Sequence, residues 1–110
     1  MAKLEKTLQG DFRTILRKIE DGILQGSLTA SLENSSDFLS NGAKCAVRVF
    51  ERYGAWGVNR LSLNVTLFES DGQIKISAIT SGGSQAMFFK INRMDETSFL
   101  RRLEEVLRDN

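Results

Sequence analysis

Two runs of alternating apolar and polar residues flank an Asp-Gly pair in the second half of the chain. The apolar positions are Leu61, Leu63, Val65 and Leu67 before the pair, and Ile74, Ile76 and Ala78 after it. Asp71-Gly72 suits a type I′ turn, because both central residues of that turn need a positive φ, so the pattern predicts a two-residue β-hairpin. Such a turn places Leu67 opposite Ile76 and Arg60 opposite Gly83. The apolar residues of both strands then share one face, as an antiparallel sheet with one buried side requires.

The pattern before this hairpin predicts two strands, a helix and a polar connection. Residues 2–9 alternate weakly, which indicates a short edge strand. Asp11 is a good helix N-cap, and the apolar residues after it recur at helical spacing as far as Gly26. Alternation over residues 27–33 predicts a second strand, and the polar residues 34–42 predict a connection.

A third strand is expected over residues 44–53. Its predicted inner face carries Cys45, Val47, Val49 and Tyr53, and its predicted outer face carries Lys44, Ala46, Arg48, Phe50 and Arg52. The segment Ala55-Trp56-Gly57 suits a three-residue hairpin loop with its glycine in the left-handed conformation. That loop places Arg52 opposite Arg60 on the next strand.

The end of the chain completes the predicted fold. Residues 86–91 either extend the sheet or cross over it, and Asp95 then opens a helix with the apolar stripe Phe99, Leu100, Leu103, Val106 and Leu107. The predicted order is β-α-β-β-β-β-α, and two amphipathic helices need one apolar sheet face to cover. We therefore expect a single α+β domain over residues 1–110. It has one antiparallel sheet of about five strands and two helices on one face, arranged like the TATA-binding protein by fold analogy only.

The composition limits the kinds of site that the protein can contain. Fifteen Lys and Arg against fourteen Asp and Glu give a net charge of +1, which argues against a dedicated nucleic-acid binder. There is no His and one Cys, Cys45, so we expect no zinc site, no internal disulfide and no Cys-His catalysis. The charged first residues lead us to expect no signal peptide, and no apolar run reaches the roughly 20 residues needed to span a bilayer. We expect a cytoplasmic protein with no cofactor, no metal and no membrane partner.

Four stretches resemble a known family. They are Arg48–Tyr53 (RVFERY), Asn59–Leu63 (NRLSL), Ser81–Gln85 (SGGSQ) and Phe88–Asn92 (FFKIN). Together they are similar to a family of small bacterial proteins described only as a domain of unknown function, over roughly the whole chain. The resemblance implies a bacterial cytoplasmic protein and supplies no catalytic residues.

The first candidate site is a corner formed by Arg52, Arg60 and Gly82-Gly83. The predicted registers place Arg60 between Arg52 on one side and the glycine pair on the other. Like charges opposed across two strands are destabilising unless something offsets them. An anion held by both guanidinium groups and by backbone N–H groups near Ser84 would offset them, as would Glu51 or an acidic side chain of a partner protein. The alternative is two solvated arginines that splay apart over a structural turn.

Two single residues are further candidates. Alternation assigns Glu51 to the inner face, where an unpaired carboxylate is costly, so we expect either a bulge or an ion pair with an arginine at the rim of the core. Trp56 lies at the tip of the predicted hairpin, where it is either a binding anchor or a cover for one end of the core.

The predicted outer face of the sheet is the largest candidate. It combines Lys44, Arg48, Arg52, Arg60 and Lys75 with Phe50, Phe68 and Ile79. Basic residues interleaved with aromatic ones can bind nucleic acid. The same apolar residues suit a sheet-to-sheet homodimer or another protein, and scattered exposed apolar residues are also common on small proteins.

We interpret the chain as a non-catalytic binding or association module that acts through this face. The alternative is a small-molecule or anion-binding protein, or an enzyme, that uses the arginine corner. An enzyme is less expected because the sequence lacks His, a Cys-based dyad and a Walker-type loop. A buried, perturbed carboxylate in a closed pocket would favour the enzyme, whereas an open outer face would favour association.

Overall fold

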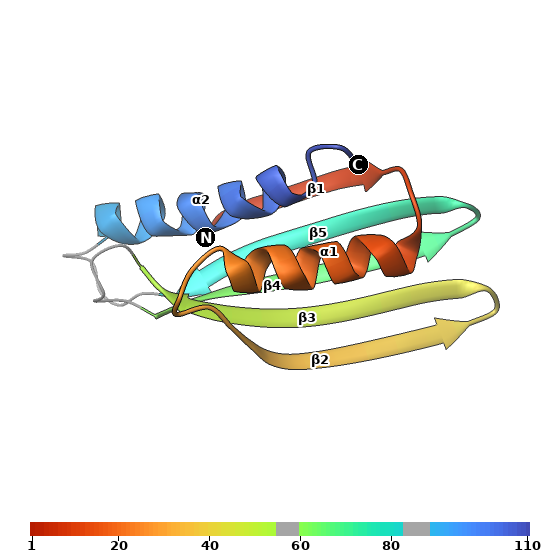
Figure 1. Cartoon of the computed structure of the whole chain (residues 1–110), viewed down its shortest axis with the longest axis horizontal. Coiled ribbons are helices and arrows are strands. Elements are labelled where there is room, and N and C mark those ends of the chain that lie inside the picture. Colours follow the sequence, from red (N-terminus) through yellow and green to blue (C-terminus); the bar gives the residue numbers. More distant parts are fainter. Residues whose placement is uncertain (55–59, 83–88) are drawn as a thin grey trace.

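One antiparallel sheet and two helices make up the described fold. The computed structural model describes residues 1–54, 60–82 and 89–110. The elements are β1 (Lys3–Leu8), α1 (Phe12–Gln25), β2 (Ser31–Ser40), β3 (Ala43–Tyr53), β4 (Arg60–Ser70), β5 (Gln73–Gly82) and α2 (Phe89–Val106). Within these residues five strands pair in the order β1-β5-β4-β3-β2, and both helices lie on one side of the sheet (Figure 1). The predicted α+β class, element order and helix placement are confirmed.

Two Asx-Gly turns join neighbouring strands of the sheet. The turn at Asp71-Gly72 has φ values of 53° and 76° and places Leu67 opposite Ile76, as predicted. The turn at Asn41-Gly42 has φ values of 50° and 81° and joins β2 to β3. The predicted connection over residues 34–42 is therefore wrong for residues 34–40, which belong to β2. This edge strand is exposed at nearly every position, so its sequence lacks the alternation that marks a half-buried strand.

The two faces of β3 are the reverse of the prediction. Phe50 pairs with Leu63 and is buried under the helices, whereas Val49 lies on the opposite side of the sheet. The predicted pairing of Arg52 with Arg60 is wrong because Tyr53 pairs with Arg60, and the predicted loop Ala55-Trp56-Gly57 lies outside the described residues. A register shift of one residue moves every side chain of a strand to the other face. Alternation did not reveal the shift because β3 has apolar residues on both faces.

The helix ends agree with the prediction for α1 but not for α2. Asp11 caps α1 by accepting a hydrogen bond from the backbone N–H of Thr14 at 2.9 Å, and Gly26 is the C-cap. α2 begins at Phe89, so the predicted start at Asp95 is wrong. The apolar run near this start is too short for its period to distinguish a strand from a helix.

The core lies between the helices and the inner face of the sheet. The helices contribute Ile15, Ile19, Ile23, Phe99, Leu100 and Leu103, the turn after α2 contributes Leu107, and the strands contribute Leu8, Ala46, Phe50, Leu61, Leu63, Val65, Leu67, Ile74, Ile76 and Ala78. Burial of each large side chain stabilises the fold by about 1.5–3 kcal/mol, which fastens the helices to this face. No described helix covers the other face of the sheet (Figure 1). Among the described helices, none is long and apolar enough to cross a membrane.

Candidate association surface on the outer face of the sheet

The outer face is the side of the sheet opposite the helices. The strand registers arrange its side chains in rows across the strands. One row is Phe38, Cys45, Phe68, Lys75 and Thr7, the next is Ser36, Val47, Thr66, Ser77 and Glu5, and the middle row is Asn34, Val49, Asn64, Ile79 and Lys3. Beyond them lie Ser31, Glu51, Ser62 and Ser81, and then Tyr53 and Arg60. Small hydroxyl and amide side chains therefore occupy much of this face.

Large apolar side chains are exposed on the outer face. Phe38 is 64% exposed and Phe68 is 42% exposed, and they flank Cys45 in one row across β2, β3 and β4. Ile79 and Tyr53 are exposed to a similar degree. The positions predicted for Phe68 and Ile79 are confirmed. Phe38 and Tyr53 were missed, because the first was assigned to a connection and the second to the inner face.

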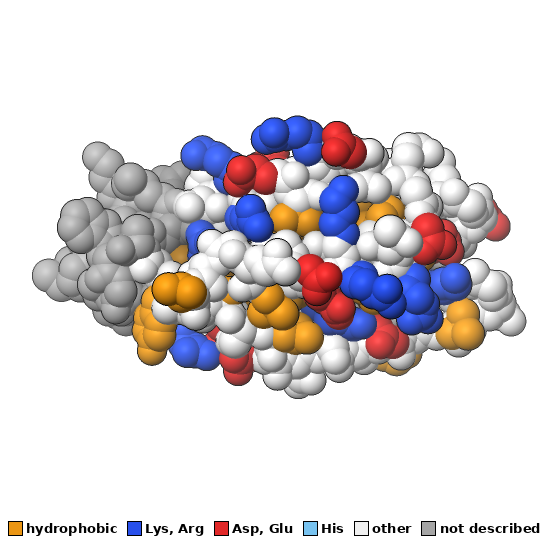
Figure 2. Space-filling model, in the orientation of Figure 1, with side chains coloured by type: hydrophobic (Ala, Val, Ile, Leu, Met, Phe, Trp, Pro, Cys, Tyr) orange, Lys and Arg blue, Asp and Glu red, His pale blue; other side chains and the backbone are white. Residues whose placement is uncertain are grey.

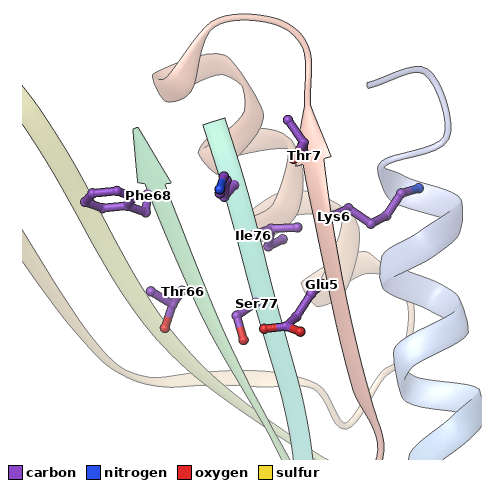
Figure 3. Close-up of a pocket in the computed structure, with 8 residues that line it drawn as sticks. Glu5, Lys6, Thr7, Thr66, Phe68, Ile76 and Ser77 are labelled. Carbon is purple, nitrogen blue, oxygen red and sulfur yellow. The ribbon is translucent and has the colours of Figure 1, made fainter. Parts of the chain in front are cut away.

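An open hollow of about 420 Å³ lies on the outer face where β4, β5 and β1 run side by side. Figure 3 shows Thr66, Ser77 and Glu5 on these three neighbouring strands, with Phe68 beside them. The registers pair Thr66 with Ser77 and Ser77 with Glu5. Hydroxyl groups and a carboxylate therefore adjoin an exposed aromatic ring at this point of the face.

Arg60 is held by two carboxylates of its own chain. Its Nε donates a hydrogen bond to Glu51, and its Nη2 donates one to Glu33 at 3.2 Å. The hydrogen bond to Glu51 raises the pKa of Arg60 above its ordinary value, and Tyr53 contributes further in the same direction. Glu51 lies on the outer face, so its predicted inner position is wrong, whereas its predicted ion pair with an arginine is confirmed.

The arginine corner does not form with the predicted geometry. Arg52 pairs with Leu61 rather than with Arg60, so the two arginines lie on opposite sides of the sheet. Gly82 has a φ of 123°, and a Cβ there would lie 2.6 Å from the Arg60 carbonyl oxygen. Close backbone approach therefore accounts for this glycine. The predictions for Gly83, Ser84 and Trp56 fall outside the described residues.

Arg48 and Arg52 connect the sheet to the helices. Arg48 is buried, and it donates to Glu20 on α1 at 2.6 Å through Nε and to Asp37 on β2 at 2.8 Å through Nη1. Burial alone would lower the pKa of Arg48, but the hydrogen bonds to Asp37 and Glu20 outweigh it and raise the pKa. Arg52 places its guanidinium carbon 4.2 Å from the ring centroid of Phe99 on α2, a cation–π contact. Both arginines therefore serve packing on the helix side.

The revised outer face differs from the predicted one in half of its members. Lys44, Arg48, Phe50 and Arg52 lie on the inner side, whereas Arg60, Lys75, Phe68 and Ile79 lie on the outer face. Its described charges are the cations Lys3, Arg60 and Lys75 and the carboxylates Glu5, Glu33 and Glu51. Over residues 1–54, 60–82 and 89–110, no group of three or more Cys, Asp and Glu side chains is placed to hold a metal ion. The outer face is thus balanced in charge and carries exposed aromatic rings.

Comparison with known proteins identifies a family but no activity. A model described as a family of unknown function (DUF6054) matches residues 1–110, and the chain belongs to this family. No curated protein matches the sequence. The solved structure of PA94 from Pseudomonas aeruginosa, a protein of unknown function suggested as a regulator, shares the fold at 11% identity. Its TM-score is 0.54, over 88% of this chain and 78% of that chain. Ara h 8.0201 aligns over 99% of this chain and 97% of its own at 14% identity, with a TM-score of 0.43 that is too low to establish a shared fold.

Proposed function

We propose that this member of a family of unknown function is a non-catalytic association module, and that its outer face binds a second copy of the same chain. The observation that carries the proposal is the exposure of Phe38 and Phe68, together with Tyr53 and Ile79, on a sheet face that no described helix covers. Burial of apolar surface is favourable by about 25 cal/mol per Å². A two-fold axis through the face would bring the same rings of both copies together.

The size of the outer face supports a stable dimer. The five strands have 6, 10, 11, 11 and 10 residues, and with a spacing of about 4.8 Å and a rise of about 3.4 Å per residue they span roughly 800 Å². A standard specific interface buries about 800 Å² on each partner. Two such faces packed as in a β-sandwich would therefore bury the area that specific dimers use.

The charges of the outer face favour a second copy over nucleic acid. Its described cations and carboxylates are equal in number, and Arg60 is already paired with Glu51 and Glu33. Nucleic-acid binding relies on an excess of positive charge that neutralises phosphates. A surface that meets its own copy benefits from both signs of charge, because each cation can face a carboxylate of the partner.

The edge strand β2 is less suited to association than the outer face. Its register with β3 shifts between Leu32 and Asn34, a β-bulge that interrupts regular pairing. It also carries Glu33 and Asp37, and charged residues on an edge strand oppose the addition of another strand. These features favour face-to-face packing over extension of the sheet.

The alternative, an anion site at the arginine corner, depended on a geometry that the structure does not have. Arg52 and Arg60 do not face each other, and Arg60 already has carboxylate partners. We further propose that the protein acts in the bacterial cytoplasm, which the family resemblance supports.

The test replaces the exposed rings and measures the molar mass by light scattering. The wild-type chain should be dimeric at micromolar concentration, and Phe38→Ser with Phe68→Ser should weaken the dimer on the order of 30-fold or more, as loss of interface hot spots does. Leu39→Ser is the matched control, because Leu39 is 75% exposed beside Phe38 but lies on the other face of β2. Circular dichroism checks that each variant folds. A monomeric wild type, or an equal loss of dimer in the control, would contradict the proposal.

A further inference from the structure

A second hollow lies where the first turns of α1 pass the β2–β3 hairpin, mostly on the helix side of the sheet, and Phe38 and Cys45 of the outer face also contribute to its lining. It has a volume of about 260 Å³. Phe12 and Leu16 of α1 and Leu39 of β2 form its apolar walls, and Arg13, Lys44 and Arg48 are cations in its lining. We call this site the hairpin hollow. We propose that it binds a small amphipathic anion, a carboxylate at the end of a short alkyl chain.

The apolar part of the proposed site is open to a ligand. Leu39 is 75% exposed although it lies on the inner side of the hairpin, because the hairpin extends beyond α1 (Figure 1). Phe12 and Leu16 are only partly buried by the core. An alkyl chain seated between these three side chains would remove apolar surface from water on both sides of the hollow.

The lining contains three cations and one carboxylate, Asp37, and this excess of positive charge favours an anionic head group. Arg48 is already committed to Glu20 and Asp37, at 2.6 Å and 2.8 Å. The remaining cations are Arg13 and Lys44. In the described part of the chain, Arg13 forms no ion pair. These two cations are therefore placed to receive a carboxylate.

The neighbours of Lys44 leave it able to reach the hollow. Its Nζ lies 3.8 Å from the nearest carboxylate oxygen of Glu69, at the outer limit of an ion pair, and 5.8 Å from the ring centroid of Phe12. The nearby Asp11 carboxylate accepts hydrogen bonds from the backbone N–H and hydroxyl of Thr14, which lower its pKa, and the charges of Lys44 and Arg13 contribute in the same direction. Figure 2 shows Lys and Arg side chains gathered between α1 and the hairpin, close to an apolar side chain near the hairpin tip.

The volume of the hairpin hollow limits the size of the ligand. It lies just below the roughly 300–1,000 Å³ of sites that hold drug-sized molecules. We therefore choose octanoate as the probe and octanol as its uncharged counterpart. Phe38 lines the hollow as well as the outer face, but Leu39 and Lys44 lie on the helix side of the sheet and Arg13 lies on α1, so substitutions of these three residues test the site separately from dimerisation.

The test titrates the folded protein with octanoate and follows heat and amide chemical shifts. Octanoate should saturate one site, shift the signals of Leu39 and its neighbours, and bind more tightly than octanol. Arg13→Gln with Lys44→Gln should weaken octanoate binding at least tenfold. Arg17→Gln with Arg101→Gln is the matched control, because it removes the same charge from exposed positions outside the hollow and should change affinity less than twofold.

Three results would overturn the proposal. They are equal affinity of octanoate for the wild type and the Arg13/Lys44 double variant, equal affinity of octanol and octanoate, and absence of saturable binding at millimolar octanoate. A Leu39→Ser variant adds a separate check on the apolar wall, because it should weaken binding while leaving both cations in place.

Discussion

Glu20→Gln should destabilise the fold more than Asp37→Asn, although each substitution removes one carboxylate from the same arginine. The Arg48 side chain is 8% exposed, and its two partners differ in burial, with Glu20 at 28% and Asp37 at 64% exposed. A hydrogen bond between charged groups that are shielded from water contributes about 1.5–3 kcal/mol, whereas an exposed ion pair contributes less than about 1 kcal/mol. We expect a loss of about 2 kcal/mol for Glu20→Gln and less than half of that for Asp37→Asn.

Arg48→Ala extends the same comparison. It removes both ion pairs and the packing of the buried aliphatic stem, so we expect a loss on the order of 3 kcal/mol. Urea unfolding at neutral pH measures all three variants, and a loss of about 2 kcal/mol lowers the midpoint by roughly 1 M for a domain of this size. Equal midpoints for the two carboxylate variants, or a larger loss for Asp37→Asn, would refute the reasoning that burial of the partner decides the effect.

Two further predictions concern the helices. Gly22→Ala should cost about 1–3 kcal/mol by overpacking, because a Cβ there would lie 2.4 Å from Cγ2 of Val106 on the other helix. Adding Val106→Ala to this variant should restore most of the lost urea midpoint, and a Gly22→Ala protein more stable than the wild type would show that the helices separate at no cost. The backbone and hydroxyl hydrogen bonds from Thr14 lower the pKa of Asp11, so its capping contribution is present above the unfolded value of about 3.9 and is lost as pH falls through the lower folded pKa. The difference in melting temperature between wild type and Asp11→Ala should therefore be constant at neutral pH and narrow below about pH 4; a difference independent of pH would contradict this.

The sequence was sufficient to predict the structure where a strand buries only one face and where a turn accepts only a few residue types. Asp71-Gly72 needs positive φ at both positions, and the strands on either side alternate cleanly, so the β4–β5 register was predicted correctly. The same holds for α1, which has a capping aspartate and a regular apolar stripe. These signals are local, and the tertiary structure agrees with them.

The sequence was insufficient where both faces of a strand have the same character. β3 carries apolar residues on both faces, and the choice between the faces depended on its predicted register with β4. An error of one residue in that register exchanged the inner and outer faces. It placed Arg48 and Arg52 on the wrong side and hid the partners of Arg48, which come from α1 and β2. β2 is exposed on both faces, so Phe38 carried no signal of its place in a strand.

Sedimentation equilibrium of the wild-type chain and of Asn64→Arg tests outer-face association most directly. Asn64 is exposed in the middle row of the outer face, on the central strand β4. Gln25→Arg is the matched control, because it adds the same side chain at an exposed position at the end of α1. Outer-face association predicts twice the 12.3 kDa chain mass for the wild type and for Gln25→Arg, and a folded monomer for Asn64→Arg. A wild-type monomer, or a dimer that persists in Asn64→Arg, would contradict it.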